Sequence, residues 1–348
     1  MGRVVLVTGV ARHLGRRLAR SLEDDPSVER VIGVDVVPPP DGLGRTEFVR
    51  ADIRNPIISK VIASAGVETV VHMSVLAQPG RAGGRTVMKE VNVIGTMQLL
   101  AACQKARSVT NLVVKSSTTV YGASPKDPAM FTEDMEPMSL PRSGFAKDSV
   151  EVEGYVRGFA RRRPDAVVTV LRFANLIGPG MSTPMTAYFE LPAVPTVLGF
   201  DPRLQFVHED DALEVLRRAA VHVHPGTYNV AGEGVLLLSQ ALRRAGKPSF
   251  PLPSPLVSSV GGMVRRARLV DFSPEQLRFL TYGRGVDTTR MREVLGFEPK
   301  YGSAAAFDDF ATARLDGPVT AERVGRLERF VGGFVGGVLG QVGGALRG

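Results

Sequence analysis

The chain opens with an apolar run and a glycine-containing turn, Val4-Val5-Leu6-Val7-Thr8-Gly9-Val10-Ala11-Arg12-His13-Leu14-Gly15. The unbroken apolar run at 4–7 predicts a strand that is buried on both faces, as in a parallel sheet. Thr8-Gly9 ends this strand, and Gly15 opens a helix predicted over 16–23. A second apolar run at 31–34 ends in Asp35, twenty residues after Gly15. The segment therefore predicts a strand–helix–strand unit.

The turn of this unit has the residue types that a dinucleotide requires. Gly9 permits a tight turn, and Gly15 lets helix and strand pack closely, while Arg12 occupies the middle position of the pattern. Such a unit places a pyrophosphate on the helix N-terminus and an acidic side chain on the adenosine ribose. The residues of this segment predicted to bind the dinucleotide are Gly9, Arg12, His13, Leu14, Gly15 and Asp35.

Charge at the turn bears on which dinucleotide is bound. The Asp35 carboxylate would repel a 2′-phosphate, which favours NAD over NADP as the cofactor. A basic side chain of Arg12, Arg16 or Arg17 could pair with the pyrophosphate, and such a charge weakens that preference.

The composition is that of an ordinary soluble enzyme, with 44% hydrophobic and 22% charged residues in 348. The formal net charge of +8 suits an anionic ligand, but Lys and Arg are scattered along the chain, which argues against a nucleic-acid partner. The single cysteine, Cys103, excludes internal disulfides and fits a reducing compartment. Because the first strand begins almost at Met1, we expect no signal peptide and a cytoplasmic location.

Predicted strands and helices alternate along the first half of the chain. Strands are expected at 47–53, 69–73, 112–117 and 167–172, and helices at 57–65, 84–105 and 143–163. This alternation predicts an α/β fold, a Rossmann-type doubly wound parallel sheet with helices on both faces. From Asn175 frequent prolines suggest a smaller C-terminal substrate lobe, and a strand at 227–230 returns to the main sheet.

The predicted domain organisation follows from these segments. Residues 1–174, with 204–233 returning to them, form the dinucleotide-binding domain, and 175–203 with 234–315 form the smaller lobe. Residues 316–348 are a separate tail in which Gly332, Gly336, Gly340 and Gly344 repeat every fourth residue. Such spacing lets helices approach closely, so the tail could pack on the body or on a partner. Peripheral membrane contact beside its arginines and disorder are the other two possibilities.

Several further motifs follow in a specific order. They are Ala51-Asp52-Ile53, Val71-His72-Met73-Ser74, Asn92-Val93-Ile94-Gly95-Thr96, Ser116-Ser117-Thr118-Thr119-Val120-Tyr121-Gly122, Leu171 to Pro179, Phe206 to Asp211 and Leu295 to Pro299. Together with the first turn, they make residues 4 to about 310 resemble an extended short-chain dehydrogenase/reductase. The resemblance is to the NAD-dependent epimerase/dehydratase group typified by UDP-glucose 4-epimerase.

The resemblance implies further binding residues. For the cofactor it adds Asp52, Ile53, His72, Met73, Ser74, Asn92 and Lys147. For the substrate it suggests Asn175, Arg203 and Arg284, with Arg290 as another basic candidate for a nucleotide diphosphate. No metal site is expected, because the His208-Glu209-Asp210-Asp211 run matches a structural motif of the family.

The resemblance also implies a mechanism in which a Tyr-x-x-x-Lys pair handles a hydroxyl proton and a Ser or Thr orients the oxygen. Ser117 matches the orienting hydroxyl and Lys147 matches the lysine, but Ser143 stands four residues before Lys147. None of the six tyrosines is followed by lysine at the fourth position. A serine hydroxyl is a much weaker acid than a phenol, so standard turnover should be impaired.

Another group could replace the missing phenol. The candidates are Tyr121, His72, Lys115 and Asp148, of which Tyr121 is preferred because it is a phenol in a segment already expected at the site. Ser143 could instead be only the N-cap of its helix.

Two functions are therefore predicted. The first is an NAD-dependent epimerase/dehydratase-type oxidoreductase that acts on a nucleotide-sugar-like small molecule through an atypical active site. The second is a catalytically silent NAD-binding scaffold or sensor that could be associated with a membrane through its tail. The resemblance further implies a homodimer that pairs through the two long helices beginning near Gly84 and Ser143.

Overall fold

The computed structural model describes residues 2–78, 83–253 and 273–315. The predicted tail at 316–348, with its possible membrane contact, lies outside the described residues, as does part of the expected smaller lobe. Within the described ranges, no helix is both long and apolar enough to cross a membrane.

The main layer is a parallel sheet of seven strands in the order β11-β6-β5-β4-β1-β2-β3. The strands are β1 (Arg3–Thr8), β2 (Val28–Asp35), β3 (Glu47–Arg50), β4 (Thr69–His72), β5 (Asn111–Ser117), β6 (Val167–Phe173) and β11 (Gly226–Val230). The predicted α/β fold of the doubly wound, Rossmann type is therefore confirmed. β11 pairs in parallel with β6, so a late segment of the chain belongs to the main sheet.

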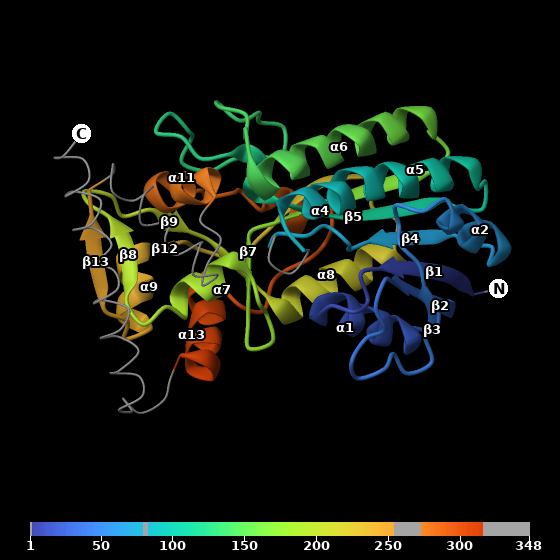
Figure 1. Cartoon of the computed structure of the whole chain (residues 1–348), viewed down its shortest axis with the longest axis horizontal. Helices are drawn as coiled ribbons and strands as arrows, with labels where there is room; N and C mark the ends of the chain where they lie inside the picture. The colour runs from blue at the N-terminus through green and yellow to red at the C-terminus, as the bar shows by residue number, and fades with distance from the viewer. Residues whose placement is uncertain (1, 79–82, 254–272, 316–348) are drawn as a thin grey trace.

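Helices cover both faces of this sheet (Figure 1). One face packs against α1 (His13–Glu23), α8 (Glu209–Val221) and α12 (Thr289–Glu293), and the other against α2 (Ile57–Ser64), α5 (Thr96–Lys105) and α6 (Gly144–Arg162). Strand β1 shows why both faces need cover. Val5 and Val7 lie in the core with α1 and α8, whereas Leu6 lies in the core with α2, α5 and α6. The apolar run thus fills two cores, as a central parallel strand must.

The helix predicted at 84–105 is interrupted by an irregular segment. It consists of α4 (Arg85–Lys89), the π-helical η1 (Glu90–Gly95) and α5. Asn92 lies in η1, where it is fully buried. Its Oδ1 accepts a hydrogen bond from Leu76 N at 2.7 Å, and its Nδ2 donates to Leu76 O at 2.9 Å. The widened turn therefore holds the chain that follows β4, and π-helical turns of this kind are frequent at functional sites.

The smaller lobe lies beyond the carboxyl ends of the strands. Its elements are α7 (Pro184–Phe189), α9 (Leu238–Arg244), α11 (Pro274–Tyr282), α13 (Ser303–Arg314), β7 (Asn175–Ile177) with β10 (Phe206–His208), β8 (Val194–Val197) with β13 (Ser249–Leu252), and β9 (Arg203–Leu204) with β12 (Leu236–Leu237). Its core is aromatic, with the rings of Phe189 and Phe307 4.9 Å apart. The exact domain boundaries given above stay a prediction.

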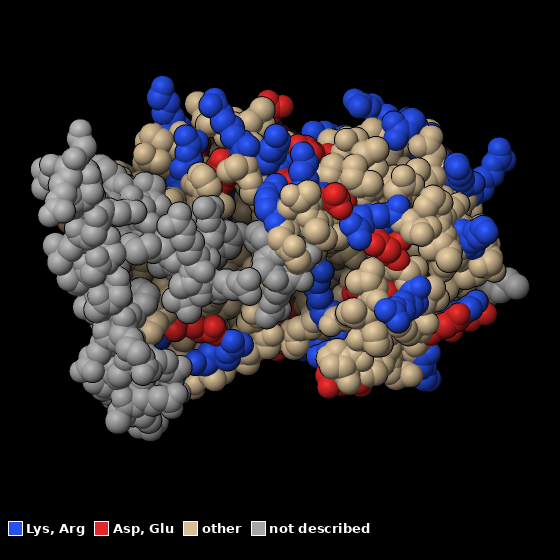
Figure 2. All heavy atoms as spheres, viewed as in Figure 1, with Lys and Arg blue, Asp and Glu red and all other residues tan. Residues whose placement is uncertain are grey.

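Charge is dispersed over one face of the described part of the chain. On the face shown in Figure 2, Lys and Arg are spread among acidic side chains and do not gather into one block. Cys103 is fully buried among apolar residues, and this burial raises the pKa of its thiol to about 12.

Candidate functional site

The turn after β1 is formed by two glycines in close contact. Gly9 has φ +79°, and its N donates to Val34 O at 2.9 Å. A Cβ on Gly15 would lie 2.3 Å from Gly9 O, so only glycine fits at that position. Gly15 lies in the first turn of helix α1, which begins at His13, and the N-cap residue Arg12 forms no side-chain cap. The turn therefore presents a helix N-terminus without a carboxylate of its own, which suits a bound phosphate.

Asp35 closes over this turn from the end of β2. Its Oδ2 accepts from Ala11 N at 3.0 Å and its Oδ1 from Val36 N at 2.8 Å. The carboxylate is thus fixed beside the turn, where an adenosine ribose would meet it. The neighbouring cations are already paired, Arg16 with Asp41 at 3.1 Å and Arg17 with Asp210 at 2.6 Å.

A cavity of about 240 Å³ begins at this turn. It runs past the end of β5 and reaches the segment that precedes and starts α7. Its described lining includes the basic side chains Arg12, His13 and Lys115, and no Asp or Glu. A wall with basic groups and no acid favours an anionic ligand.

Three residues at the end of β5 line this cavity, Lys115, Ser116 and Ser117, and the Ser116 hydroxyl donates to Glu153 Oε1 of α6. Lys115 and Ser117 are two residues apart on one strand, so they point to the same face. Burial, with a smaller contribution from the Arg12 guanidinium, lowers the pKa of Lys115 from its ordinary 10.5 to about 8. Ser117 Oγ accepts from Thr119 N at 3.2 Å and remains able to donate its own proton. The structure thus pairs the predicted Ser117 with a lysine that the sequence analysis ranked below Tyr121.

The start of α6 differs from the prediction. Ser143 is at the N-cap position, but its side chain makes no cap hydrogen bond, and its buried Oγ has no partner within the described structure. Lys147 does not line the cavity. It keeps 45% of its side chain exposed, and its Nζ lies 3.8 Å from Glu151 Oε1. The residue of this helix that does reach the cavity is Phe145.

Phe145 was missed, although the helix periodicity contains the signal. Val152, Val156 and Phe159 form the buried stripe of α6. Counting back from Val152 by three and then four residues reaches Ser149 and Phe145, and passes by Lys147. Ser149 is buried, and its Oγ donates to Phe145 O at 2.9 Å. Phe145 and Ser149 have the four-residue spacing of the expected pair, but they supply neither a phenol nor an ammonium.

Tyr121 lies in a separate polar network and does not line the cavity. Its hydroxyl lies 2.9 Å from Asn229 Oδ1 and receives a hydrogen bond from Arg172 Nη1 at 2.7 Å. The ring stacks on Phe131 with centroids 4.6 Å apart. Burial raises the pKa of this phenol above its ordinary value. The structure therefore does not bring Tyr121 together with Ser117.

His72 lies at the end of β4, between two hydroxyl groups. Its Nδ1 is 3.0 Å from Thr8 Oγ1, and its Nε2 is 2.9 Å from Thr96 Oγ1. Burial, with the nearby charge of Lys115, lowers its pKa to about 4. A neutral imidazole held on both sides positions the strand ends of β1 and β4.

The other residues predicted for the cofactor are distributed around the same edge of the sheet. Met73 lines the cavity, and Ser74 lies against Gly9, with its Oγ 3.2 Å from where a Cβ on that glycine would be. Asp52 is held by Arg54, whose Nη2 donates to Oδ2 at 2.6 Å, and this hydrogen bond lowers the pKa of the carboxyl. Ile53 packs beneath Gly95.

The residues predicted for the substrate divide into two groups. Asn175 lines both the main cavity and a smaller neighbouring one of about 60 Å³, which Arg284 also lines. The Arg284 guanidinium lies over Phe279 at 4.9 Å and contacts Gly122 O, and burial lowers its pKa to about 10. Arg203 in β9 lines neither cavity, and exposed Arg290 lies 3.4 Å from Asp134.

The sequence is similar to a known family and to several proteins of that kind. The sequence model of the NAD dependent epimerase/dehydratase family matches residues 5–231. An uncharacterized protein of Mycobacterium tuberculosis (strain H37Rv) is 49% identical over 316 residues, which cover 90% of this chain and 84% of that protein. The UDP-glucose 4-epimerase of Mycolicibacterium smegmatis is 27% identical over 318 residues, which cover 86% of this chain and 94% of the epimerase.

Solved structures with the same architecture include two that act on nucleotide sugars according to their names. UDP-glucose 4-epimerase from Thermotoga maritima, solved with UDP-glucose, has a TM-score of 0.69 at 20% identity over 89% of this chain and 98% of its own. A dTDP-glucose 4,6-dehydratase from Bacillus anthracis, solved with NAD, has a TM-score of 0.67 at 18% identity. The match covers 90% of this chain and 96% of the dehydratase. At these identities the likeness shows a shared fold.

Proposed function

The chain belongs to the NAD-dependent epimerase/dehydratase family, a family of enzymes with NAD as cofactor, and on that premise we propose that it oxidises a nucleotide sugar in an atypical active site. The observation behind this proposal is the cavity that joins the glycine turn to Ser117, with basic side chains and no acid in its described wall. An anionic dinucleotide and an anionic sugar nucleotide both fit such a wall.

The residues at the turn fit the cofactor. The close contact of Gly9 and Gly15 leaves the N-terminus of α1 open to a pyrophosphate, and the fixed Asp35 carboxylate can bind the adenosine ribose hydroxyls. Bound NAD supplies the two-electron acceptor for the reaction. The chain's own part is to orient the substrate hydroxyl, for which Ser117 is the candidate, and to accept its proton.

The smaller cavity supports the substrate class. It adjoins the main cavity through Thr119, Phe145 and Asn175, and it contains the buried guanidinium of Arg284. A buried guanidinium is a suitable partner for a phosphate oxygen. Relatives that are named as UDP-sugar epimerases support the same class.

The test is to load the purified protein with NAD and to supply a panel of UDP- and dTDP-sugars. We expect one sugar nucleotide to be converted, or the bound nicotinamide to be reduced transiently, as absorbance reports. A protein that binds NAD by calorimetry and does neither with any member of the panel would contradict the proposal.

The second candidate function is a silent NAD-binding scaffold or sensor. It is favoured by Phe145, because an aromatic ring without a hydroxyl occupies the helix position that reaches the cavity. Turnover that disappears in Ser117→Ala would reject this alternative, since a scaffold needs no hydroxyl there.

We further propose a cytoplasmic homodimer. The support is an exposed apolar surface on the side of the sheet that α5 and α6 cover, with Ile94, Met97 and Tyr155 exposed by 43%, 37% and 39%. Light scattering of the purified protein tests this proposal, and a monomer at all concentrations would contradict it.

A further inference from the structure

Lys115 is a basic group in the cavity that the family's usual chemistry does not use. It lies on β5 two residues before Ser117, on the same face of the strand, and both residues line the cavity. The residue as a whole is half-buried, and its ammonium group is surrounded by protein atoms.

The charge of Lys115 is not neutralised by the described protein. Within the described residues, Lys115 has no hydrogen bond or ion pair. The charged and titratable groups that act on it are Arg12, from the glycine turn, and His72, from β4. Neither is an acid, so neither can compensate an ammonium.

The helices that pack on β5 offer no counter-ion either, because their buried acids are engaged elsewhere. On α8, Glu209 pairs with His13 and Arg17, and Asp211 accepts from backbone N–H groups. The two buried acids of α6, on the other face of the sheet, are also paired. Asp148 Oδ1 accepts from Arg85 Nη2 at 2.6 Å, and Glu153 Oε2 accepts from Arg172 Nη2 at 2.7 Å. Burial and the Arg12 charge therefore bring the pKa of Lys115 down to about 8, and its neutral amine is populated near neutral pH.

The other acid–base side chain of the described lining, His13, is held by the carboxylate of Glu209. Phe145 supplies a ring without a hydroxyl, and Ser149 is buried against Phe145 O. Lys147 is half-exposed and lies outside the lining. Lys115 is thus the one amine in the described cavity wall, and it lies beside the hydroxyl of Ser117.

We infer that Lys115 Nζ exchanges a proton with the substrate hydroxyl that Ser117 orients, in place of a tyrosine and lysine on α6. This inference rests on the proposed function. The substrate carbinol gives its hydroxyl proton to neutral Nζ, which becomes an ammonium, and its hydride to an oxidised nicotinamide. The carbinol carbon becomes a carbonyl and loses two electrons, which the nicotinamide gains. In the reverse direction the carbonyl carbon regains a hydride from the reduced nicotinamide and its oxygen takes the proton from the ammonium, which restores the carbinol.

The first measurement is nicotinamide reduction in the holo protein with the sugar nucleotide found for the wild type. Lys115→Met and Lys115→Arg should each lower the rate by roughly 100- to 10,000-fold, because neither side chain offers a neutral amine. Calorimetry should still find NAD bound to both variants.

The wild-type rate should rise with pH and level off above about pH 8, because the base is the deprotonated form. Lys60→Met, which alters an exposed lysine of α2, is the matched control and should keep the wild-type rate.

The second measurement needs no turnover. Trace acylation of the holo protein across a pH series, read by mass spectrometry, gives the titration midpoint of each lysine. Lys115 should titrate near 8, well below the ordinary lysine value of about 10.4. Adding the sugar nucleotide should protect Lys115 from acylation and leave Lys60 unchanged.

The failures of the two proposals are distinguishable. A wild type that reduces its nicotinamide, with Lys115→Met equally active, overturns the inference alone. Loss of the reaction in Lys147→Met but not in Lys115→Met also overturns it, because the helical lysine would then be the acting one. A Lys115 that titrates at the ordinary lysine value, or that the sugar nucleotide does not protect, overturns it as well. A wild type that binds NAD but never reduces it contradicts the proposed function, and with it the inference.

Discussion

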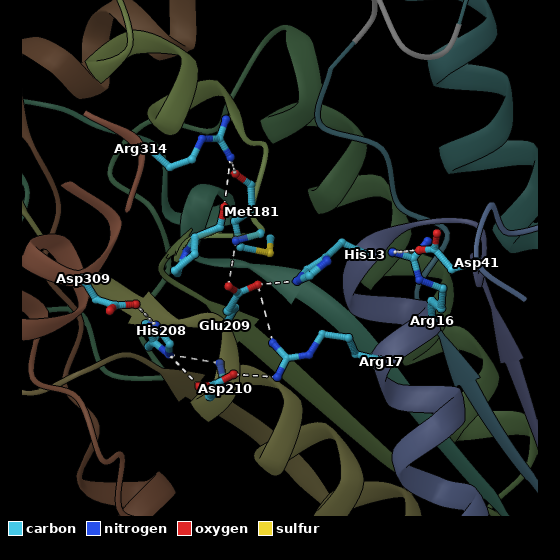
Figure 3. Close-up of polar contacts among 12 residues, drawn as sticks. His13, Arg16, Arg17, Asp41, Met181, His208, Glu209, Asp210, Asp309 and Arg314 are labelled. Atoms are coloured by element: carbon cyan, nitrogen blue, oxygen red, sulfur yellow. Dashed lines mark hydrogen bonds and ion pairs between the residues drawn. The ribbon is translucent and has the colours of Figure 1, made fainter. Parts of the chain in front are cut away.

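His13 Nε2 lies against the carboxylate of Glu209, so the turn after β1 is joined to the start of α8 (Figure 3). The same carboxylate accepts from Gly180 N at 2.8 Å and lies 3.5 Å from Arg17 Nη1. Glu209 is 4% exposed, whereas His13 and Gly180 both line the cavity. One buried acid therefore fixes two walls of the site relative to each other.

Glu209→Gln tests this linkage. The neutral amide can still accept from Gly180 N, but it no longer compensates the basic side chains around it. We expect the free energy of unfolding to fall by roughly 1–3 kcal/mol and NAD affinity to weaken. Urea denaturation and calorimetry measure the two effects. The matched control is Asp210→Asn, the next residue, which pairs with the same Arg17 at 2.6 Å but is 46% exposed. Asp210→Asn should lower the free energy of unfolding by less than about 1 kcal/mol. Equal losses in the two variants would contradict the role given to the buried acid.

Gly15→Ala tests the closeness of the turn. The added methyl would lie 2.3 Å from Gly9 O and 2.9 Å from Gly9 C, and both atoms are backbone that cannot rotate away. We expect a loss of roughly 1–3 kcal/mol in the free energy of unfolding, together with loss of NAD binding. Gly154→Ala is the matched control, because its new methyl has Arg157 Nη2 as its nearest neighbour, at 3.9 Å. This substitution should raise the free energy of unfolding by up to about 1 kcal/mol. Unchanged NAD affinity in Gly15→Ala would show that the cofactor does not use this turn.

Asp35→Asn tests the choice between NAD and NADP. The substitution keeps one acceptor for the amides of Ala11 and Val36 but removes the charge that repels a 2′-phosphate. We expect the ratio of NAD to NADP affinity to fall about tenfold, equivalent to about 1.4 kcal/mol. Calorimetry with both dinucleotides measures this ratio. Asp41→Asn, which removes a carboxylate that is 64% exposed and pairs with Arg16, should leave the ratio unchanged. A ratio that responds equally to both substitutions would indicate a general charge effect.

The sheet and its turn could be predicted because their causes are local in sequence. A strand buried on both faces must be apolar throughout, as 4–7 and 31–34 are, and the glycines and Asp35 have spacings that the turn itself requires. The π-helical turn at Glu90–Gly95 was not predicted, because what accompanies it is a pair of hydrogen bonds between Asn92 and Leu76. That contact depends on the tertiary path of the chain.

Which side chain near Ser117 enters the cavity was harder to predict for a geometric reason. Tyr121 follows Ser117 by only four residues, but the short 3-10 helix η2 (Thr118–Tyr121) turns the chain between them. Thr119 still lines the cavity, whereas the Tyr121 ring turns into the network with Arg172 and Phe131. Adjacency in sequence therefore gave no information on which side chain enters the cavity. Alternation along β5 places Lys115 and Ser117 on one face and turns the Ser116 hydroxyl to Glu153 on the other.

Lys115→Met should make the protein more stable near neutral pH. The folded-state pKa of about 8 lies below the unfolded value of about 10.4, so the folded chain binds fewer protons between these two pH values. Wild-type stability therefore rises with pH through this window, and below about pH 8 the fold bears the full cost of the buried ammonium. At about 1.4 kcal/mol per pKa unit, Lys115→Met should raise the free energy of unfolding by up to about 3 kcal/mol at pH 7. This gain should shrink toward about pH 10.

Urea denaturation of both proteins at several pH values between about 7 and 10 measures this gain, and the exposed Lys60→Met should stay within about 0.5 kcal/mol of the wild type throughout. A Lys115→Met gain that does not depend on pH would mean that the added apolar contact, and not the ammonium, sets the difference. If stability rises while nicotinamide reduction is lost, the wild-type protein keeps a destabilising charge because the reaction requires it, as is common for residues of active sites.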